Sequence, residues 1–366
     1  MSTIDNDDLL DLKKEIIEAG LKLQQKGLIV RTWGNISCRV NKKYFLITPS
    51  GIRYEDLTPD KIVLVKISDL SYKGDIKPSS EYKVHAACYR ARKDISFIVH
   101  THQVYATVAG ALGKKEIRTE YNDERFIVPC ALYGYPGSDR LADNVGRIAG
   151  KYSLSNAFIM ANHGAVCFGN NSYEAIAEAE KLEIACQTYL ADVCNLSMGH
   201  GLEEGYSSHR QDDKIVFDFG DIPDRVRKIH EEIYAKRPDI NYIVHNKSEA
   251  VLTISRRVNQ MRPLLDDFAQ LIGVKVRIPV NDHGRDGNNI YVKKNVNAVF
   301  VLNDGAYCLG ATLDDAQAVS LVLDKGCMAH LAVLRYGEGH FLSTLDCIRM
   351  NRFYRNSYSK LADKKS

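Results

Sequence analysis

Apolar positions recur along the chain at two different spacings. Residues three and four apart predict amphipathic helices, and compact apolar runs between glycine, proline or aspartate predict strands. Helices are predicted at 8–25, 79–92 and 172–190, and strands at 44–48, 62–66, 95–100 and 156–162. The helix at 79–92 is expected to begin with Ser79 as its capping residue, after Pro78. Strands and helices therefore follow one another closely through the first half of the chain.

The chain also contains an internal repeat. Residues 85–100 match 230–245 without a gap at an offset of 145, and 162–169 match 303–310 at an offset of 141. Chance similarity between two apolar strand–helix units is the alternative, but two gapless blocks in the same order argue against it. We predict a first domain at 1–204 and a partial second copy at 205–366.

Four polar residues of the first copy are not retained as a set in the second. At these offsets Glu81 is replaced by Val226, His102 by Lys247 and His163 by Asp304, whereas His100 persists as His245. Packing positions survive while three of the four polar residues are lost together. This pattern indicates a shared task that the second copy no longer performs.

A metal site shared by the four residues is the simplest explanation of their joint replacement. His100 and His102 are separated by one residue at a strand end, so their side chains point to the same face. His163 follows a strand and precedes glycine, and Glu81 lies at a helix start. Imidazole and carboxylate groups are common zinc ligands. Each residue also has an ordinary alternative: polar residues at a strand end, a turn histidine, or an acidic first helical turn.

Composition narrows the functional classes. The net charge of +3 is too small to indicate nucleic acid or an anionic membrane as a partner. We expect no apolar run long enough to cross a bilayer, and the acidic N-terminal residues are unlike a secretory signal. Nine scattered cysteines without a Cys-x-x-Cys pair indicate reduced thiols in a cytoplasmic protein.

Five motifs follow one another along the first copy: Gly34-Asn35-Ile36-Ser37, Ile47-Thr48-Pro49-Ser50-Gly51, Lys77-Pro78-Ser79-Ser80-Glu81, His100-Thr101-His102 and Asn162-His163-Gly164. In these motifs and their order the first copy resembles the class II aldolase and adducin family, which includes enzymes of the L-fuculose-1-phosphate aldolase and L-ribulose-5-phosphate 4-epimerase types. The resemblance implies an α/β/α sandwich around a mostly antiparallel sheet, duplicated here with a partial second copy. It also implies a homo-oligomer, built as a dimer of tandem chains or a larger assembly.

The same resemblance assigns roles to individual residues. His100, His102 and His163 correspond to the ligands of Zn²⁺ or of another divalent ion such as Mn²⁺ or Co²⁺. Glu81 corresponds to the acid/base residue, which can also contact the metal. The family's phosphate-binding positions correspond to Asn35, Ser50, Gly51, Ser79 and Ser80. Here a turn glycine and a helix-capping serine are the ordinary alternatives for Gly51 and Ser79.

A further catalytic group is expected from a neighbouring subunit or from the second copy. Tyr121 is near the position of a tyrosine that donates a proton in the aldolases, and an ordinary interface tyrosine is its alternative. Asp266 and Asp267 occupy the equivalent place in the second copy and could be lent to the active metal. Neither assignment follows from the residues without the resemblance.

These observations predict a metal-dependent aldolase that cleaves or forms a carbon–carbon bond of a small ketose phosphate. An epimerase, dehydratase or decarboxylase of the same family would use the same groups. A non-catalytic adducin-like scaffold and a phosphosugar-sensing module are the alternatives from other classes. The second copy is predicted to hold neither metal nor phosphate and to have a structural role.

Overall fold

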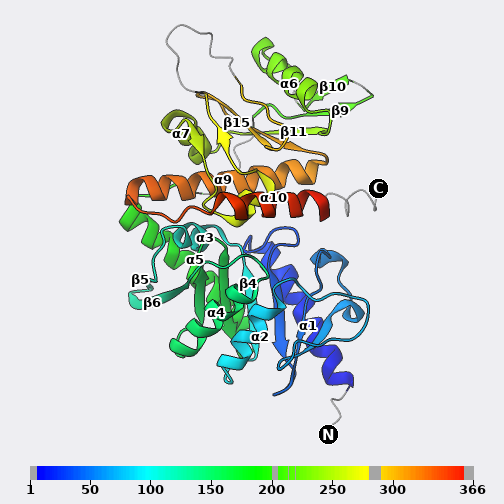
Figure 1. Ribbon diagram of the computed structural model, residues 1–366, viewed down its shortest axis with the longest axis vertical. Helices are drawn as coiled ribbons and strands as arrows, with labels where there is room; N and C mark the ends of the chain where they lie inside the picture. Colours follow the sequence, from blue (N-terminus) through cyan, green and yellow to red (C-terminus); the bar gives the residue numbers. More distant parts are fainter. Residues whose placement is uncertain (1–5, 200–204, 213, 219, 280–289, 358–366) are drawn as a thin grey trace. The chain divides into compact units, whose positions relative to one another are not determined.

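The computed structural model describes residues 6–199, 205–212, 214–218, 220–279 and 290–357. The chain divides into two compact units, Met1–Val193 and Cys194–Ser366, each with its own sheet (Figure 1). The sequence placed the border later, between residues 204 and 205. Each unit is described separately below.

Unit 1 is built on a single eight-stranded sheet in the order β3-β2-β1-β4-β8-β7-β6-β5. Its neighbouring strands are antiparallel except for the parallel pair β6–β7. The strands are β1 Asn35–Arg39, β2 Tyr44–Ile47, β3 Val63–Lys66, β4 Phe97–Thr101, β5 Glu116–Tyr121, β6 Glu124–Ala131, β7 Ala157–Met160 and β8 Gly164–Gly169. The predicted mostly antiparallel sheet is thereby confirmed.

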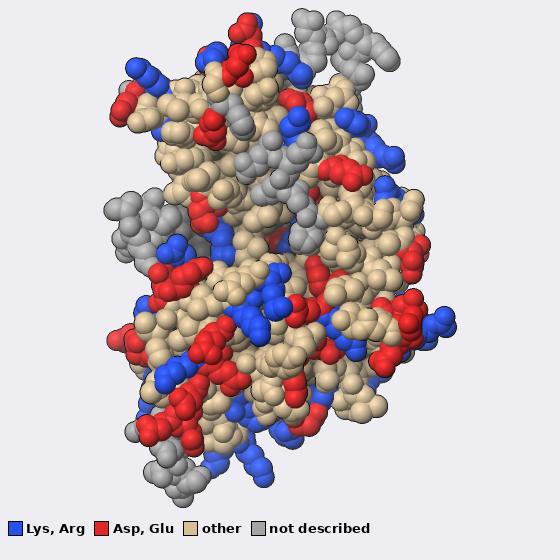
Figure 2. Space-filling model, turned by 180° about the vertical axis from the view of Figure 1, so that it is seen from behind, with Lys and Arg blue, Asp and Glu red and all other residues tan. Residues whose placement is uncertain are grey.

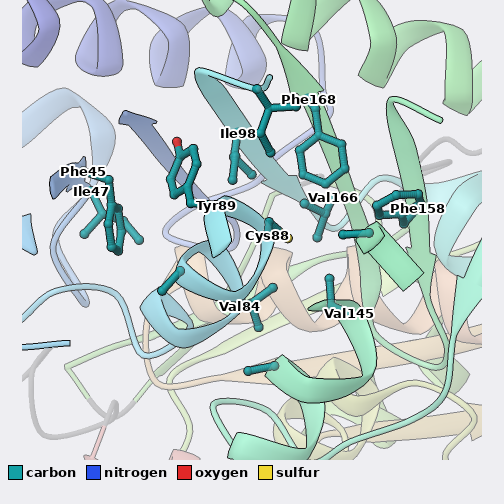
Figure 3. Close-up of a cluster of buried hydrophobic side chains, with 14 of the residues drawn as sticks. Phe45, Ile47, Val84, Cys88, Tyr89, Ile98, Val145, Phe158, Val166 and Phe168 are labelled. Carbon is teal, nitrogen blue, oxygen red and sulfur yellow. The ribbon is translucent and has the colours of Figure 1, made fainter. Parts of the chain in front are cut away.

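Helices cover both faces of this sheet. On one face, α2 (Tyr82–Ala91) and α4 (Asp139–Lys151) pack on a core that includes Tyr89, Phe158 and Phe168 (Figure 3). On the other face lie α1 (Asn6–Gln25), α3 (Val104–Gly110) and α5 (Ser172–Cys194). This is the α/β/α sandwich that the family resemblance implied.

One predicted boundary is wrong in a way that matters for the site. Helix α2 begins at Tyr82 and not at Ser79, and no side chain caps its first turn. The Ser79 hydroxyl instead accepts a hydrogen bond from the Glu81 backbone N–H at 3.3 Å. Residues 79–81 therefore form a turn before the helix, in which Ser80 is exposed while Ser79 and Glu81 are buried.

Unit 2 repeats the centre of this architecture. Its main sheet has the order β10-β9-β11-β15-β14, which matches β2-β1-β4-β8-β7 of unit 1 strand for strand. A separate two-stranded sheet joins β12 and β13. The strands are β9 Ser208–Gln211, β10 Lys214–Phe217, β11 Tyr242–Asn246, β12 Gln260–Met261, β13 Val276–Arg277, β14 Ala298–Val301 and β15 Gly305–Gly310.

The helices of unit 2 also fall on two faces. Residues of α6 pack with one side of β11, β14 and β15 in an apolar cluster, while α7 and α9 contact the same sheet through other residues. Helix α10 packs mainly on the short α8. The helices are α6 Asp224–Lys236, α7 Glu249–Arg257, α8 Asp266–Leu271, α9 Leu313–Tyr336 and α10 Thr344–Ser357.

A buried hydrogen-bond motif recurs in both units. In unit 1 the Ser37 hydroxyl contacts His85 Nδ1 at 2.6 Å and the Tyr89 hydroxyl at 2.9 Å. In unit 2 Ser208 makes the same contacts with His230 at 2.7 Å and Tyr234 at 3.2 Å. Because partners far apart in the sequence are retained together, the motif holds the first strand of each sheet to its first covering helix.

The repeat therefore begins earlier than the sequence comparison indicated. In the sequence, residues 215–219 are the only segment of unit 2 that could be matched, as a short lead-in, to the long N-terminal part of unit 1. Instead the β9–β10 hairpin pairs with β11 as β1–β2 pairs with β4, so Ser208 stands in the place of Ser37. Gly205 then stands in the place of Gly34. The comparison missed these positions because the connection between β10 and α6 is much shorter than that between β2 and α2.

Helix α9 corrects another expectation. The segment Leu313–Tyr336 is long and apolar enough to cross a membrane by length and composition alone, although we expected no such run. In the structure, 78% of its apolar window is buried inside the protein, which is the environment of a core helix. Its apolar residues are therefore explained by packing on β11 and β15.

The buried His230 predicts a pH dependence of stability. Burial, with a further contribution from His245, lowers the pKa of His230 to about 3. An exposed histidine in the unfolded chain titrates near pH 6.5. Between these values the unfolded state binds a proton that the folded state excludes, so the free energy of unfolding falls as the pH falls through this window. We expect His230→Gln to reduce this dependence, measured as urea midpoints by circular dichroism at pH 7 and pH 5.

The exposed His340 offers a control for this prediction. His340→Gln should leave the difference between the two midpoints as in the wild type. Equal differences in the wild type and in His230→Gln would contradict the assignment.

Candidate metal centre

Three segments of unit 1 converge at one end of β4. His100 belongs to β4 and faces the same side of the sheet as Ile98, toward α2. His163 lies in the turn between β7 and β8, where Asn162 has a φ of 64°. Gly164 is required after it because a Cβ there would lie 2.3 Å from the Thr101 carbonyl oxygen. This close approach brings His163 beside the end of β4.

The side chains of Glu81, His100, His102 and His163 meet in one cluster. Their possible ligand atoms all lie within 4.8 Å of one another. His100 Nε2 is 3.1 Å from His102 Nε2 and 3.2 Å from His163 Nε2. The two oxygens of Glu81 lie 2.9 Å from His100 Nε2 and 3.0 Å from His163 Nε2. Glu81, His100 and His163 are buried and His102 is half-buried, so the accessible side of the cluster is at His102.

The protonation of His100 shows why a cation fits this cluster. Its Nδ1 lies 2.8 Å from the Ala165 carbonyl oxygen, which can only accept a hydrogen bond, so Nδ1 carries the proton. Nε2 points toward the Glu81 carboxylate and the other imidazoles, where a neutral ring presents a lone pair and a protonated ring an N–H donor. Such lone pairs repel unless a proton or a cation lies between them. Ligand atoms about 2.0–2.1 Å from a tetrahedral ion are about 3.3 Å apart, close to the spacing here.

Glu81 is held in its ionised form by the same neighbours. Burial raises the pKa of its carboxyl group, but His163 and His100 together outweigh this effect and hold the pKa well below its usual range. A carboxylate in this position can act as a metal ligand or as a base. The cluster therefore combines groups that can bind a metal with a carboxylate that can accept a proton.

A hydrogen-bond chain that the sequence analysis missed supports Glu81. The Asn35 side-chain N–H donates to Glu81 Oε2 at 3.2 Å, and His85 Nε2 lies 2.5 Å from Asn35 Oδ1. His85 in turn accepts from Ser37 through Nδ1. Burial, with His100 adding to it, lowers the pKa of His85 to about 3, so this ring is neutral and one tautomer fits both contacts. The only signal in the sequence was the retention of His85 as His230 in the second copy.

The residues predicted to bind phosphate lie close to the same cluster. The loops around Ser50 and Ser79 run side by side, because Ser50 N donates to the Lys77 carbonyl and Ser79 N donates to the Thr48 carbonyl, at 3.0 and 2.9 Å. Asn35 pairs with His100 across β1 and β4. Ser50, Gly51 and Ser80 are exposed, whereas Ser79 and Asn35 are buried.

Tyr121 is not brought to the cluster within unit 1. It ends β5, at the edge of the sheet and separated from β4 by β8, β7 and β6. The following turn, at Asn122 and Asp123, has positive φ angles of 49° and 64° and returns the chain into β6. A role for Tyr121 thus requires a site in another unit and stays a prediction.

The corresponding acidic residues of unit 2 are buried in their own unit. Asp266 is 0% exposed and Asp267 is 3% exposed. Asp267 also forms an ion pair with the buried Lys325 at 2.5 Å. Side chains that are packed inside unit 2 are not offered to another active site, so the structure contradicts that hypothesis for Asp266 and Asp267.

In unit 2 the place of the metal cluster is filled by packed side chains. His245 Nε2 lies 2.7 Å from the Asp304 carbonyl oxygen, and the imidazole stacks on the Tyr307 ring at 4.2 Å between centroids. Tyr307 occupies the position of Val166 in unit 1. Within the described parts of the chain, the cluster of unit 1 is the single group found with a geometry that could hold a metal.

Comparison with known proteins agrees with this geometry. The family described as Class II Aldolase and Adducin N-terminal domain matches residues 14–190 and 210–331. The 5-deoxy-D-ribulose 1-phosphate aldolase of Bacillus thuringiensis serovar kurstaki is 35% identical over 184 residues, which are 48% of this chain and 83% of that protein. The L-fuculose phosphate aldolase of Escherichia coli K12 is 32% identical over 184 residues, 49% of this chain and 82% of that protein.

A relative that is named as an epimerase, and not as an aldolase, matches the same half of the chain. The probable L-ribulose-5-phosphate 4-epimerase of Mycoplasma pneumoniae is 31% identical over 197 residues, 49% of this chain and 81% of that protein. Among solved structures, an L-fuculose 1-phosphate aldolase has 30% identity and a TM-score of 0.45, over 50% of this chain and 86% of that one. Because the family matches segments of both units that together make up most of the chain, this protein belongs to the class II aldolase and adducin family.

Proposed function

We propose that unit 1 is a metal-dependent aldolase that cleaves or forms a carbon–carbon bond of a small ketose phosphate. The convergence of three imidazoles and one ionised carboxylate on a single point carries this proposal. The names of the relatives, two of them sugar-phosphate aldolases, support the substrate class. A pure scaffold would have no physical reason to hold four mutually repulsive ligand groups together in one unit.

In the proposed reaction, a cation would polarise the substrate and the residues around it would move the proton. A divalent ion such as Zn²⁺, held by His100, His102 and His163, would act as a Lewis acid on the substrate's carbonyl oxygen. Glu81 is ionised and stands on the same point, so it can take or return the proton on the adjacent oxygen or carbon. Asn35 and His85 orient this carboxylate through their hydrogen bonds.

The loops at 48–51 and 77–80 are proposed to hold the phosphate. Ser50, Ser79 and Ser80 bring hydroxyl groups to these paired loops, and Gly51, with a φ of 72°, leaves its backbone open to an anion. Asn35 has two amide hydrogens; one is donated to Glu81 and the second can be donated to a phosphate oxygen. Because Ser79 and Ser80 lie just before the first residue of α2, the start of that helix adds a favourable electrostatic field at these two serines.

An epimerase is the second candidate. The probable L-ribulose-5-phosphate 4-epimerase of Mycoplasma pneumoniae matches the same half of the chain. Such a reaction would use the same cation and carboxylate and differ in how the intermediate is held. Dehydratase or decarboxylase activity would require only a different substrate at the same groups.

Assembly and location are predicted separately from the chemistry. We propose a homo-oligomer in the cytoplasm, with Tyr121 reaching the site of a neighbouring unit and unit 2 holding no metal. On the face seen in Figure 2, acidic and basic side chains are interspersed. The described residues on that face therefore form no extended basic patch of the kind that a nucleic-acid-binding protein carries.

The first prediction concerns metal content. The purified wild-type chain should contain about one equivalent of a divalent transition metal, measured by inductively coupled plasma mass spectrometry. His102→Ala removes one of the imidazole ligands and should lower the bound metal by about tenfold or more after dialysis. His245→Ala, at the equivalent of His100 in unit 2, is the matched control and should retain the metal. Full metal content in His102→Ala would contradict the proposed ligand set.

The second prediction concerns catalysis. Glu81→Gln keeps the shape of the side chain but removes its charge and its ability to accept a proton. We expect kcat for aldehyde release from a panel of ketose 1-phosphates to fall by about 10²–10⁴-fold. A coupled alcohol dehydrogenase assay measures the aldehyde, and chromatography of the sugar phosphates detects epimerisation. Glu174→Gln, on the exposed start of α5, serves as the control. Unchanged turnover in Glu81→Gln would exclude its role as acid/base.

The third prediction separates the supporting role of His85 from simple folding. His85→Leu leaves Ser37 and Asn35 without their buried partner, at a cost of about 1–3 kcal/mol for each. His230→Leu removes the equivalent imidazole of unit 2, which contacts Ser208 but no counterpart of Asn35. Both variants should unfold at lower urea concentration than the wild type. His85→Leu alone should also weaken Zn²⁺ binding, measured by competition with a chromophoric chelator. Equal Zn²⁺ affinity in the two variants would show that the chain through Asn35 does not act on the metal site.

A further inference from the structure

Unit 2 contains a cavity that plays no part in the proposed reaction. Its volume is about 750 Å³, within the range typical of small-molecule sites. The residues that line it come from the end of α7, from β12 and its flanks, from the turn between β14 and β15, and from α9 with the segment after it. They are Ser255, Arg256, Arg257, Val258, Asn259, Gln260, Arg262, Pro279, Leu302, Asn303, His330, Leu334 and Phe341.

The charges around this cavity are of one sign. Three of its lining residues are arginines, and no Asp or Glu is among those that the structure describes. Arg256 and Arg257 are exposed at the end of α7, and neither forms an ion pair within the described residues. A helix C-terminus favours cations, which would explain these two residues. It does not explain Arg262, which follows β12 on a separate segment.

Two of the three arginines stand where unit 1 carries no charge. At the offset of 145 residues, which aligns the first residues of α3 and α7, Ala111 and Leu112 occupy the places of Arg256 and Arg257. Both unit 1 side chains are buried and apolar. Strand β12 begins at Gln260 where β5 begins at Glu116, so Arg262 stands in the place of the exposed Arg118. Unit 2 therefore adds two positive charges beside an arginine position that both units share.

One wall of the cavity is apolar and fixed in position. The Arg262 guanidinium lies over the Phe341 ring at 5.5 Å, and His330 packs edge-on against the same ring at 5.7 Å. The buried His330 donates from Nε2 to the Arg262 carbonyl at 2.7 Å, which holds this segment against α9. Leu334 adds an exposed apolar surface. The cavity thus combines cationic groups with an aromatic and aliphatic wall.

We propose that this cavity binds a small phosphorylated metabolite, with its phosphate at the arginines and an apolar or ring portion against Phe341 and Leu334. Arginine is the residue best suited to pair with phosphate oxygens through two parallel hydrogen bonds. The amides of Asn259, Gln260 and Asn303 supply further donors around the anion. This site is independent of the proposed aldolase reaction, because every residue in it belongs to unit 2.

The test uses phenyl phosphate, which carries both parts of the proposed ligand. Isothermal titration calorimetry of the full-length chain should show saturable binding of phenyl phosphate, weaker binding of inorganic phosphate and no binding of phenol. Arg256→Ala combined with Arg257→Ala should weaken phenyl phosphate by about tenfold or more. Ser79→Ala combined with Ser80→Ala alters the proposed phosphate loop of unit 1 and should leave this binding event in place.

A matched control removes the same charge elsewhere in unit 2. Arg349 and Arg352 are exposed on α10 and do not line the cavity, so Arg349→Ala with Arg352→Ala should bind phenyl phosphate as the wild type does. Absence of saturable binding to the wild-type chain would overturn the proposal. Equal weakening by both arginine pairs would overturn it as well, because it would reduce the effect to net charge. Thermal unfolding of each variant, expected to match the wild type, excludes loss of the fold as the cause.

Discussion

The site depends on one electrostatic constraint: lone pairs from three imidazoles and a carboxylate are directed at the same point. Groups that repel one another at about 3 Å stay together only if the surrounding fold holds them or a cation neutralises them. Here the fold supplies part of the restraint. His100 is fixed by the Ala165 carbonyl, and Glu81 by Asn35 and, through it, His85. A bound cation would supply the rest of the restraint by neutralising the repulsion between the lone pairs.

The duplication separates the interactions that build the fold from those that build the site. Unit 2 keeps the contacts of Ser208 with His230 and Tyr234, although it lacks counterparts of Glu81 and Asn35. The equivalent serine and histidine of unit 1 are therefore needed by the sheet and its helix, whatever the site does. Asn35 is the added link that connects this structural motif to Glu81. The Glu81 carboxylate is thus positioned by extending a contact that the fold already requires.

Sequence reasoning grouped the four residues that the structure brings together, because strand alternation and the repeat can both be read along the chain without knowledge of the fold. His100 and His102 follow from the spacing along a strand, and the joint replacements in the second copy relate Glu81 and His163 to them. The start of α2 was placed wrongly, because a serine after proline fits a helix cap as well as it fits the turn that the paired loops impose at Ser79. The role of His85 could not be predicted, since a histidine on a helix becomes a hydrogen-bond relay only through strand β1, which lies far away in the sequence.

The fate of the site in unit 2 follows from the same constraint. Where Glu81, His102 and His163 are replaced by Val226, Lys247 and Asp304, the remaining imidazole makes other contacts. His245 donates from Nε2 to the Asp304 carbonyl and stacks on Tyr307, a ring that stands where unit 1 has Val166, while its buried Nδ1 has no hydrogen-bond partner among the described residues. A ring at that position in unit 1 would fill the space the ligands share. With tyrosine in place of valine, replacing Val226, Lys247 and Asp304 alone would therefore leave a ring stacked on His245, and the cluster of unit 1 would not be reproduced in unit 2.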